Sequence, residues 1–241
     1  MEPSLMVASL TERLTPLFGA ALLAWILCVC VHEFSHALVA YWGGDTSVRE
    51  KGYLSLDPTR FIDPMFSLLV PAIVLALGGL PLPGGSVQID HARLRSAKWS
   101  RYVSAAGPAS NLLLFLAFAL PLHPRLGLVE PFAAPQPTWV YFFGAMAVLN
   151  FVGTLFNLIP IPPLDGYGMI EHRFSYEMQF KLRQNAMVAF GALFMLFWVF
   201  PPIWQPFWWM FDRVSESLGF PTRLMIDGFN YILFGVVPRA F

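Results

Sequence analysis

The sequence predicts an all-α polytopic membrane protein with about five to six membrane helices. Hydrophobic residues make up 56% of the chain and charged residues only 12%, whereas soluble domains carry about 25% charged residues. The mean hydropathy is +0.59. Apolar blocks long enough to cross a hydrocarbon core of roughly 30 Å recur along the chain. We therefore expect a single integral membrane domain over residues 1–241, with a core at about 14–170 and further helices at 183–241.

The charged side chains are balanced, with 15 basic and 15 acidic residues and no net charge at pH 7. The sequence has no basic patch of the kind that binds nucleic acid, so we expect the lipid bilayer, and no nucleic acid, as a partner. The two cysteines, Cys28 and Cys30, lie two positions apart in an apolar helix and point to different faces. We expect two small buried hydrophobic side chains there, and neither a mutual disulfide nor a pair of thiolate ligands.

The first helix is expected to begin at Thr15 and Pro16 and to run to about Trp42, before two glycines at 43–44. Its length is sufficient to cross the bilayer. Arg13 is the single basic residue before it, so the segment lacks the positively charged start of a cleaved signal peptide. We expect the segment to remain in the protein as a membrane anchor.

A second apolar block, at 65–80, lies between polar stretches at 45–65 and 86–103. Sixteen helical residues reach about 24 Å, which is short of a full crossing. We therefore expect a re-entrant segment there, or one packed inside the fold. Short membrane-associated β-strands are expected at 51–56 and 82–90, because these stretches have strand-like patterning.

Two further membrane helices are predicted at 104–120 and 138–159. The first is entered through the sequence GPASN at 107–111. The second is followed by three prolines within 160–163, which cannot form regular helix, so the backbone there is expected to be unwound. We expect an interfacial stretch at 167–184 and another span at 185–200. A short apolar piece at 229–237 completes a further span or lies in the interface.

The sequence HEFSH at 32–36 lies inside the first apolar helix. His32 and His36 are four residues apart, so on a helix they share one face and lie about 6 Å apart along the axis. Two imidazoles placed in this way can hold a zinc ion, and Glu33 beside them can act as general base for a bound water. Ionisable groups inside a membrane helix are costly to bury and usually serve a function. The alternative is a chance match in which both histidines are satisfied core residues.

A catalytic zinc site takes three protein ligands and keeps one position open, so HEFSH requires a third ligand from elsewhere in the chain. Asp165 is the best candidate, because it follows the proline-broken segment at a helix end and precedes Gly166, which lets the backbone approach closely. The other candidates lie in solvated loops or beside polar and turn residues, which favours a surface or interfacial place for each of Asp45, Asp63, His91, His123 and His172.

Membrane topology provides a check on this choice. His36 lies near the end of the first helix and Asp165 just past the end of 138–159, so an even number of crossings must separate them. The helices at 104–120 and 138–159 make two, which requires that 65–80 does not cross. With the N-terminus outside, the segments expected in the cytoplasm hold ten Lys and Arg residues and the outer segments hold two, as the positive-inside rule requires. Both observations place the metal toward the cytoplasmic face.

Three motifs, taken in order, resemble the site-2 protease family of intramembrane zinc metalloproteases. They are HEFSH at 32–36, GPASN at 107–111 and NLIPIPPLDG at 157–166. The layout looks most like the compact prokaryotic members, without a PDZ or CBS domain. The sequence departs from the family after LDG, where Tyr167, Gly168 and Met169 stand in place of the more usual Gly-Gly-Arg.

The resemblance implies that His32, His36 and Asp165 hold zinc and that Glu33 is the catalytic base. It also implies that Asn111 and Asn157 border the site and hold the substrate chain or polarise its carbonyl. The alternative for both asparagines is hydrogen bonding between helices.

The activity that the resemblance implies is hydrolysis of a peptide bond in or near the transmembrane helix of a membrane-protein substrate. The implied location is the cytoplasmic (inner) membrane of a prokaryote. Two other classes of function compete with this interpretation, a metal carrier and a non-catalytic, zinc-containing membrane chaperone. A carrier would not need Glu33, and the chain shows no paired broken helices of inverted repeats.

Overall fold

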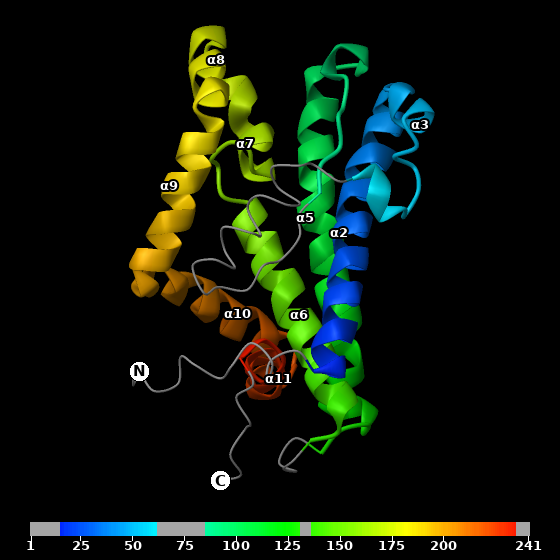
Figure 1. The fold of residues 1–241 in the computed structure, drawn as a ribbon, viewed down its shortest axis with the longest axis vertical. Coiled ribbons are helices and arrows are strands. Elements are labelled where there is room, and N and C mark those ends of the chain that lie inside the picture. The colour runs from blue at the N-terminus through cyan, green and yellow to red at the C-terminus, as the bar shows by residue number, and fades with distance from the viewer. Residues whose placement is uncertain (1–14, 62–84, 131–135, 235–241) are drawn as a thin grey trace.

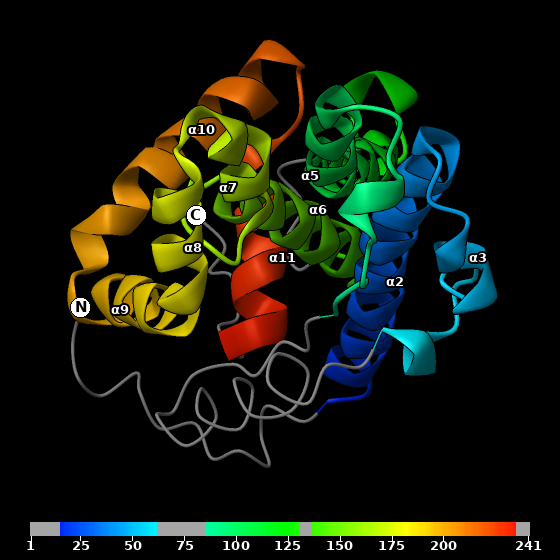
Figure 2. The same cartoon turned by 90° about the horizontal axis from the view of Figure 1, so that it is seen from above.

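The computed structural model describes residues 15–61, 85–130 and 136–234. About 77% of this part of the chain is helical and none of it is strand, which confirms the all-α class. Three long helices, α2, α5 and α6, stand side by side, and a column formed by α8 and α9 stands opposite them (Figure 1). Seen from above, α2 and α9 lie on opposite sides of the molecule (Figure 2).

Helix α2, Pro16–Gly43, has the ends that the sequence predicts. The side chain of Thr15 accepts a hydrogen bond from the backbone N–H of Phe18 at 3.1 Å, and Pro16 occupies the first helical position. At the other end Gly44 adopts the left-handed conformation (φ 115°), and its N–H donates to carbonyls of the last turn. A helix of 28 residues is about 42 Å long, which exceeds the thickness of a bilayer core.

Helix α6, Thr138–Asn157, matches its prediction to within two residues. Helix α5, Ala97–Ala119, begins earlier than predicted and continues as the 3-10 turn η5, Leu120–Leu122. The GPASN sequence at 107–111 therefore lies inside α5 and does not begin it, with Pro108 in the helix interior. The predicted start is wrong because α5 includes the second half of the polar and basic stretch at 86–103, and polarity alone does not end a helix.

Among the residues that the structure describes, three helices are long and apolar enough to cross a membrane, namely α2, α5 with η5, and α6. A fourth crossing is added if α9, Ala186–Val199, and α10, Gln205–Ser217, count as one span. The chain bends by 97° between them, at a break just before η8, Pro201–Trp204. The described residues therefore do not support the predicted number of five to six. Proline interrupts the apolar stretch after α9, and α11, Thr222–Phe234, has only 13 residues.

The predicted β-strands are absent from 51–56 and from 85–90. Gly52 has φ +78°, and its N–H bonds back to the carbonyl of Arg49, so this stretch closes the turn after α3, Ser47–Glu50. The two stretches are linked by the Lys51 ammonium group, which donates to the carbonyl of Gln88 at 2.9 Å, and not by a strand ladder. The expected re-entrant segment at 65–80 lies outside the described residues.

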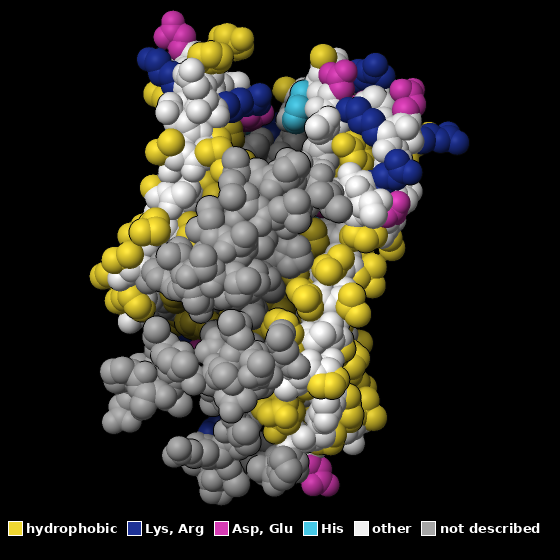
Figure 3. Space-filling model, in the orientation of Figure 1, with side chains coloured by type: hydrophobic (Ala, Val, Ile, Leu, Met, Phe, Trp, Pro, Cys, Tyr) yellow, Lys and Arg dark blue, Asp and Glu magenta, His cyan; other side chains and the backbone are white. Residues whose placement is uncertain are grey.

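The buried core joins α5, α6, α10 and α11. Phe115 of α5 packs edge to face with Phe151 of α6 and Phe211 of α10, with ring centroids 5.1 and 6.2 Å apart. The remaining described elements are short: η2 Pro58–Arg60, η4 His91–Arg93, η6 Pro124–Leu126, α7 Asp165–Ile170, η7 Glu171–Arg173 and α8 Tyr176–Gln184. Apolar side chains cover the flanks of the molecule, whereas Lys and Arg gather at the end that carries α3 and α8 (Figure 3).

Candidate metal centre

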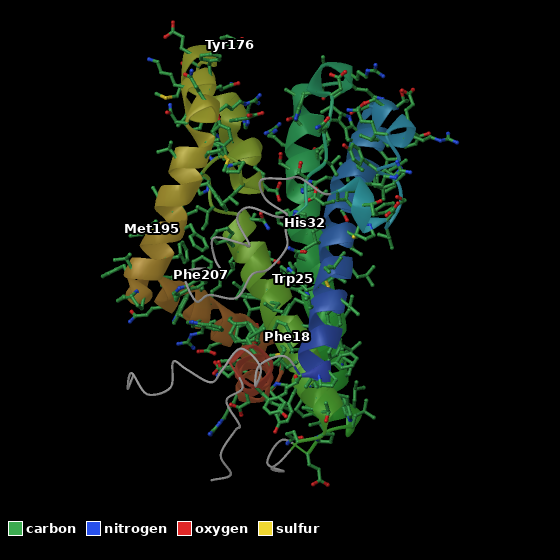
Figure 4. All side chains as sticks on the ribbon, viewed as in Figure 1. Phe18, Trp25, His32, Tyr176, Met195 and Phe207 are labelled. Atoms are coloured by element: carbon green, nitrogen blue, oxygen red, sulfur yellow. The ribbon has the colours of Figure 1, made fainter. Side chains whose placement is uncertain are left out.

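Helix α2 carries His32, Glu33 and His36 on one buried stretch, and each of the three is at most 8% exposed. The two imidazole rings face each other edge to face, with centroids 4.8 Å apart, and their Nε2 atoms are 3.1 Å apart. Figure 4 shows His32 within the length of α2, far from either helix end. The one-turn spacing of the histidines thus produces the shared face that the sequence predicts.

Asp165 is the first residue of α7 and reaches both histidines. Its Oδ2 lies 3.2 Å from Nε2 of His32, and its Oδ1 lies 3.3 Å from Nε2 of His36. The three donor atoms lie within 4.8 Å of one another, and no other group of this kind occurs among the described residues. Asp165 is the candidate chosen from the sequence, whereas Asp45, His91, His123 and His172 lie outside the cluster and Asp63 is not described. The surface place that the sequence predicts for Asp45 is wrong, because its side chain is 0% exposed and accepts hydrogen bonds from Ser47 and Asp90.

The protonation of the cluster favours a cation between these atoms. Nδ1 of His36 lies 2.7 Å from the carbonyl oxygen of Val103, which can only accept a hydrogen bond, so Nδ1 carries a proton. In the neutral ring Nε2 then has a lone pair, which faces the carboxylate of Asp165. Oδ2 of Asp165 is buried and accepts no hydrogen bond from the described residues. Two imidazoles and a carboxylate that converge in this way fit the ligand set of a catalytic zinc ion.

Comparison with known proteins assigns the chain to a family. Each of three relatives is named “Putative zinc metalloprotease”: Rip2 of Mycolicibacterium smegmatis, Rip2 of Mycobacterium tuberculosis and YwhC of Bacillus subtilis. Rip2 of M. smegmatis is 34% identical over 210 residues, which cover 83% of this chain and 76% of the relative. Rip2 of M. tuberculosis (strain H37Rv) is 36% identical over the same shares of both chains. YwhC is 33% identical over 80% of this chain and 86% of its own length.

This chain belongs to the site-2 protease-like family of Rip2 and YwhC. No family model and no solved structure matches it. The names of the relatives support a zinc metalloprotease, and the cluster of His32, His36 and Asp165 is compatible with zinc.

In this member of the Rip2 and YwhC family, Gly107 of α5 lets the helices approach closely at the centre. A Cβ atom at Gly107 would lie 2.5 Å from both Cε1 and Nε2 of His32 and would overlap Nε2 of His36. One turn earlier, Val103 supplies the carbonyl that fixes the His36 ring. Gly107 begins the GPASN motif and Val103 precedes it, but neither function was predicted from the sequence. A glycine inside an apolar helix is the signal that could have revealed the close approach.

Gly166 has a similar function beside Asp165. A Cβ atom there would lie 2.7 Å from the carbonyl oxygen of Ile159 and would overlap the carbonyl of Leu158, so only glycine lets the turn after α6 fold against the start of α7. This turn spans 158–164 and contains the prolines, and it is irregular as predicted. It carries the chain from the end of α6 back to the histidines, which brings Asp165 into the cluster.

Glu33 lies beside the metal ligands without being one of the three. Gly85 packs on it, since a Cβ at Gly85 would lie 3.0 Å from Cγ of Glu33 and 3.1 Å from Cγ1 of Val29. The backbone N–H of Val87 lies beside the Glu33 carboxylate. The segment that begins at residue 85 therefore forms one wall around this glutamate.

The two asparagines meet the same turn of α6. Asn111 on α5 is 5% exposed. A Cβ atom added to Gly153 of α6 would lie 3.2 Å from Nδ2 of Asn111. Asn157 donates from Nδ2 to the carbonyl of Gly153 at 3.1 Å, within its own helix. Both side chains thus lie at the contact between α5 and α6. A role for either in holding substrate stays a prediction.

A cavity of about 250 Å³ is lined in part by Asp165, the third ligand. Its wall combines prolines and other apolar residues with polar side chains, and it includes an ion pair between Arg183 and Glu171 at 2.6 Å. The residues that line it are His91, Ser104, Pro162, Pro163, Leu164, Asp165, Tyr167, Gly168, Glu171, Arg183 and Ala186. The cavity therefore adjoins the metal cluster at Asp165 and has charged groups on its wall.

Proposed function

We propose that the protein is an intramembrane zinc metalloprotease, which hydrolyses a peptide bond in or near the transmembrane helix of another membrane protein. The observation that supports this most directly is the convergence of His32, His36 and Asp165 inside a helix that is long enough to span a bilayer. A cluster of three ionisable side chains at this place is costly unless it serves a function. The family of Rip2 and YwhC supports the same chemistry.

In this proposal His32, His36 and Asp165 hold the ion. Zinc, when bound, polarises the scissile carbonyl and makes water acidic enough to be deprotonated near neutral pH. Glu33 accepts the proton of the attacking water and delivers it to the leaving amine. The Val103 carbonyl keeps the His36 ring in the tautomer that presents Nε2 to the ion.

Water is a reactant, so the buried centre needs a polar route. The cavity of about 250 Å³ supports this, because it adjoins Asp165 and exceeds the roughly 30 Å³ that one water molecule occupies in the liquid. Its wall carries charged groups of both signs, Arg183 and Glu171, which stabilise water better than they would an apolar chain.

The substrate in this proposal is a membrane helix that unwinds locally, because the carbonyls of an intact helix are occupied by its own hydrogen bonds. Asn111 and Asn157, at the contact of α5 with α6, are the side chains that we assign to holding the opened segment. We place the protein in the cytoplasmic (inner) membrane of a prokaryote, with its N-terminus outside and the centre toward the cytoplasm. The gathering of Lys and Arg at the end that carries α3 and α8 supports this orientation (Figure 3).

The test compares the wild-type protein with Glu33→Gln, both purified in detergent. The substitution removes the proton acceptor and keeps the side-chain shape, so zinc content should stay at one ion per chain while cleavage of a membrane-protein substrate falls by at least about 100-fold. Glu177→Gln, on the exposed face of α8, is the matched control and should keep full activity. Equal cleavage by Glu33→Gln and wild type would reject Glu33 as the base. Zinc binding without cleavage by the wild type would reject the protease and would favour a chaperone or a metal carrier.

A further inference from the structure

The buried carboxylate of Asp45 lies just past the end of α2, outside the metal cluster. It is 0% exposed, and a buried carboxylate is costly unless hydrogen bonds satisfy it. Ser47 donates twice to Oδ1, from its backbone N–H at 3.0 Å and from its hydroxyl at 2.6 Å. The backbone N–H of Asp90 donates to Oδ2 at 2.8 Å. Asp45 therefore links the end of α2 to a segment 45 residues further along the chain.

That segment, residues 85–90, is fixed at alternate positions. The backbone N–H of Ser86 donates to the carbonyl of Phe61 at 3.0 Å, and the carbonyl of Gln88 accepts from the Lys51 ammonium group at 2.9 Å. Asp90 bonds to Asp45, as described. Between these anchors, the side chains at 87 and 89 pack on the small apolar cluster at the end of α2. The segment is thus held along its length without being part of a sheet.

The start of the same segment contacts the glutamate of the HEFSH motif. Gly85 packs against Cγ of Glu33, and the backbone N–H of Val87 lies beside the Glu33 carboxylate. Because a backbone N–H is fixed by the backbone around it, the position of this donor depends on the anchors that hold residues 86 to 90. Asp45 supplies the one anchor among them that is a buried charged group.

We propose that Asp45 is a positioning residue for catalysis: by fixing Asp90 it fixes the segment 85–90, and the backbone of that segment in turn orients Glu33. The proposal rests on the proposed function only where Glu33 acts as the base. Its structural part, the link from Asp45 to Val87, stands independently of the reaction.

Asp57 provides a matched control for Asp45, because it makes the same local turn without the long-range link. Its Oδ1 accepts from the backbone N–H of Thr59 at 3.0 Å and from the Thr59 hydroxyl at 2.7 Å. Its Oδ2 lies 3.5 Å from Nε of Arg60, only three residues away. An Asp→Asn change at either position removes one carboxylate oxygen from an otherwise equal turn, and only at Asp45 does a distant backbone N–H lose its acceptor.

The experiment measures hydrogen exchange, zinc content and cleavage for the wild type, Asp45→Asn and Asp57→Asn in detergent. In Asp45→Asn the amides of 85–90 should exchange about tenfold faster or more, because a charge-assisted bond no longer opposes local opening. kcat should fall by about 10- to 100-fold with KM and zinc content unchanged, as expected for a displaced base. Asp57→Asn should match the wild type in all three measurements.

A second variant, Lys51→Met, keeps the test decisive if Asp45→Asn does not fold. Lys51 is exposed and holds the same segment at Gln88, so its loss should change exchange and kcat in the same direction by a smaller factor. Unchanged exchange at 85–90 in Asp45→Asn, or an equal loss of kcat in Asp57→Asn, would overturn the proposal. A wild-type protein that holds zinc and cleaves nothing would overturn the catalytic part together with the proposed protease, while exchange would still report the link itself.

Discussion

Replacing Gly107 by alanine should disable the metal centre while leaving the chain folded. The added Cβ would lie 2.5 Å from Nε2 of His32, which is about 1 Å short of an ordinary carbon contact of roughly 3.5 Å. It would also overlap Nε2 of His36. Because both rings belong to α2 and the new methyl group to α5, either the helices separate or the rings turn away from Asp165.

The magnitude follows from the tolerance of metal sites. Ligand distances in working sites stay within about 0.2 Å of their ideal values, so a displacement of about 1 Å is several times too large. Disturbing only the partners that orient ligands costs roughly 10- to 100-fold in metal affinity, so a direct displacement of two ligands should cost about 100-fold or more. The overpacking should also lower the free energy of unfolding by about 1–3 kcal/mol.

The assay is zinc affinity, measured by competition with a chelator, together with thermal unfolding of the metal-free protein. Gly19→Ala on α2 is the matched control, because a Cβ there meets nothing within 4 Å. It should keep wild-type zinc affinity and gain up to about 1 kcal/mol in stability from its higher helix propensity. Wild-type zinc affinity in Gly107→Ala would refute the close approach of α5 to the two histidines as the structure has it.

Three further outcomes test other parts of the structure. Asp165→Asn should lower zinc affinity by about 100-fold or more with little change in melting temperature, since it removes the one anionic ligand, and zinc competition checks this. Gly228→Ala should destabilise the fold by about 1–3 kcal/mol in thermal unfolding, because its Cβ would lie 2.5 Å from the carbonyl oxygen of Tyr141, whereas Gly191→Ala meets nothing and should not. Burial opposes ionisation of Asp45, but hydrogen bonds and nearby Lys51 lower its pKa below the ordinary value. The stability that this lowered pKa provides is complete above the ordinary value of about 3.9 and is lost as the pH falls through the lowered pKa. Protection of the amides at 85–90, corrected for the intrinsic exchange rate at each pH, should therefore fall in acid, and less so in Asp45→Asn.

Much of the centre could be predicted because its chemistry is local or depends on topology. The i, i+4 spacing of His32 and His36 fixes their shared face on any helix, whatever surrounds it. Thr15 and Gly44 mark the ends of α2 through backbone needs that belong to those residues. Asp165 was predicted from its place between a proline-broken helix end and Gly166, with the number of crossings as a check, and its carboxylate oxygens lie 3.2 and 3.3 Å from the two Nε2 atoms.

The failures share a physical cause, which is that tertiary contacts decided the outcome. Polar residues at 97–101 suggested a loop, yet they form the first turns of α5. Alternation at 51–56 suggested a strand, yet Gly52 turns the chain and no partner strand is present among the described residues. The function of Gly107 depends on which helix faces it, and no pattern within α5 specifies that neighbour.

Helix α5 is the element that assembles the centre, although it supplies no ligand. On one turn its Val103 carbonyl holds the His36 ring, and on the next Gly107 leaves room for both imidazoles. Between them, Ser104 fills the space that a Cβ of Gly168 would occupy, so α7 packs closely on the same stretch of α5. The ligands on α2 and the ligand on α7 are therefore positioned by one short surface of a third helix. A change that moves α5 must therefore displace the ligands on α2 and the ligand on α7 together. This explains why small residues occupy these contacts. Replacing one of them should cost more than replacing a residue at an ordinary packing position.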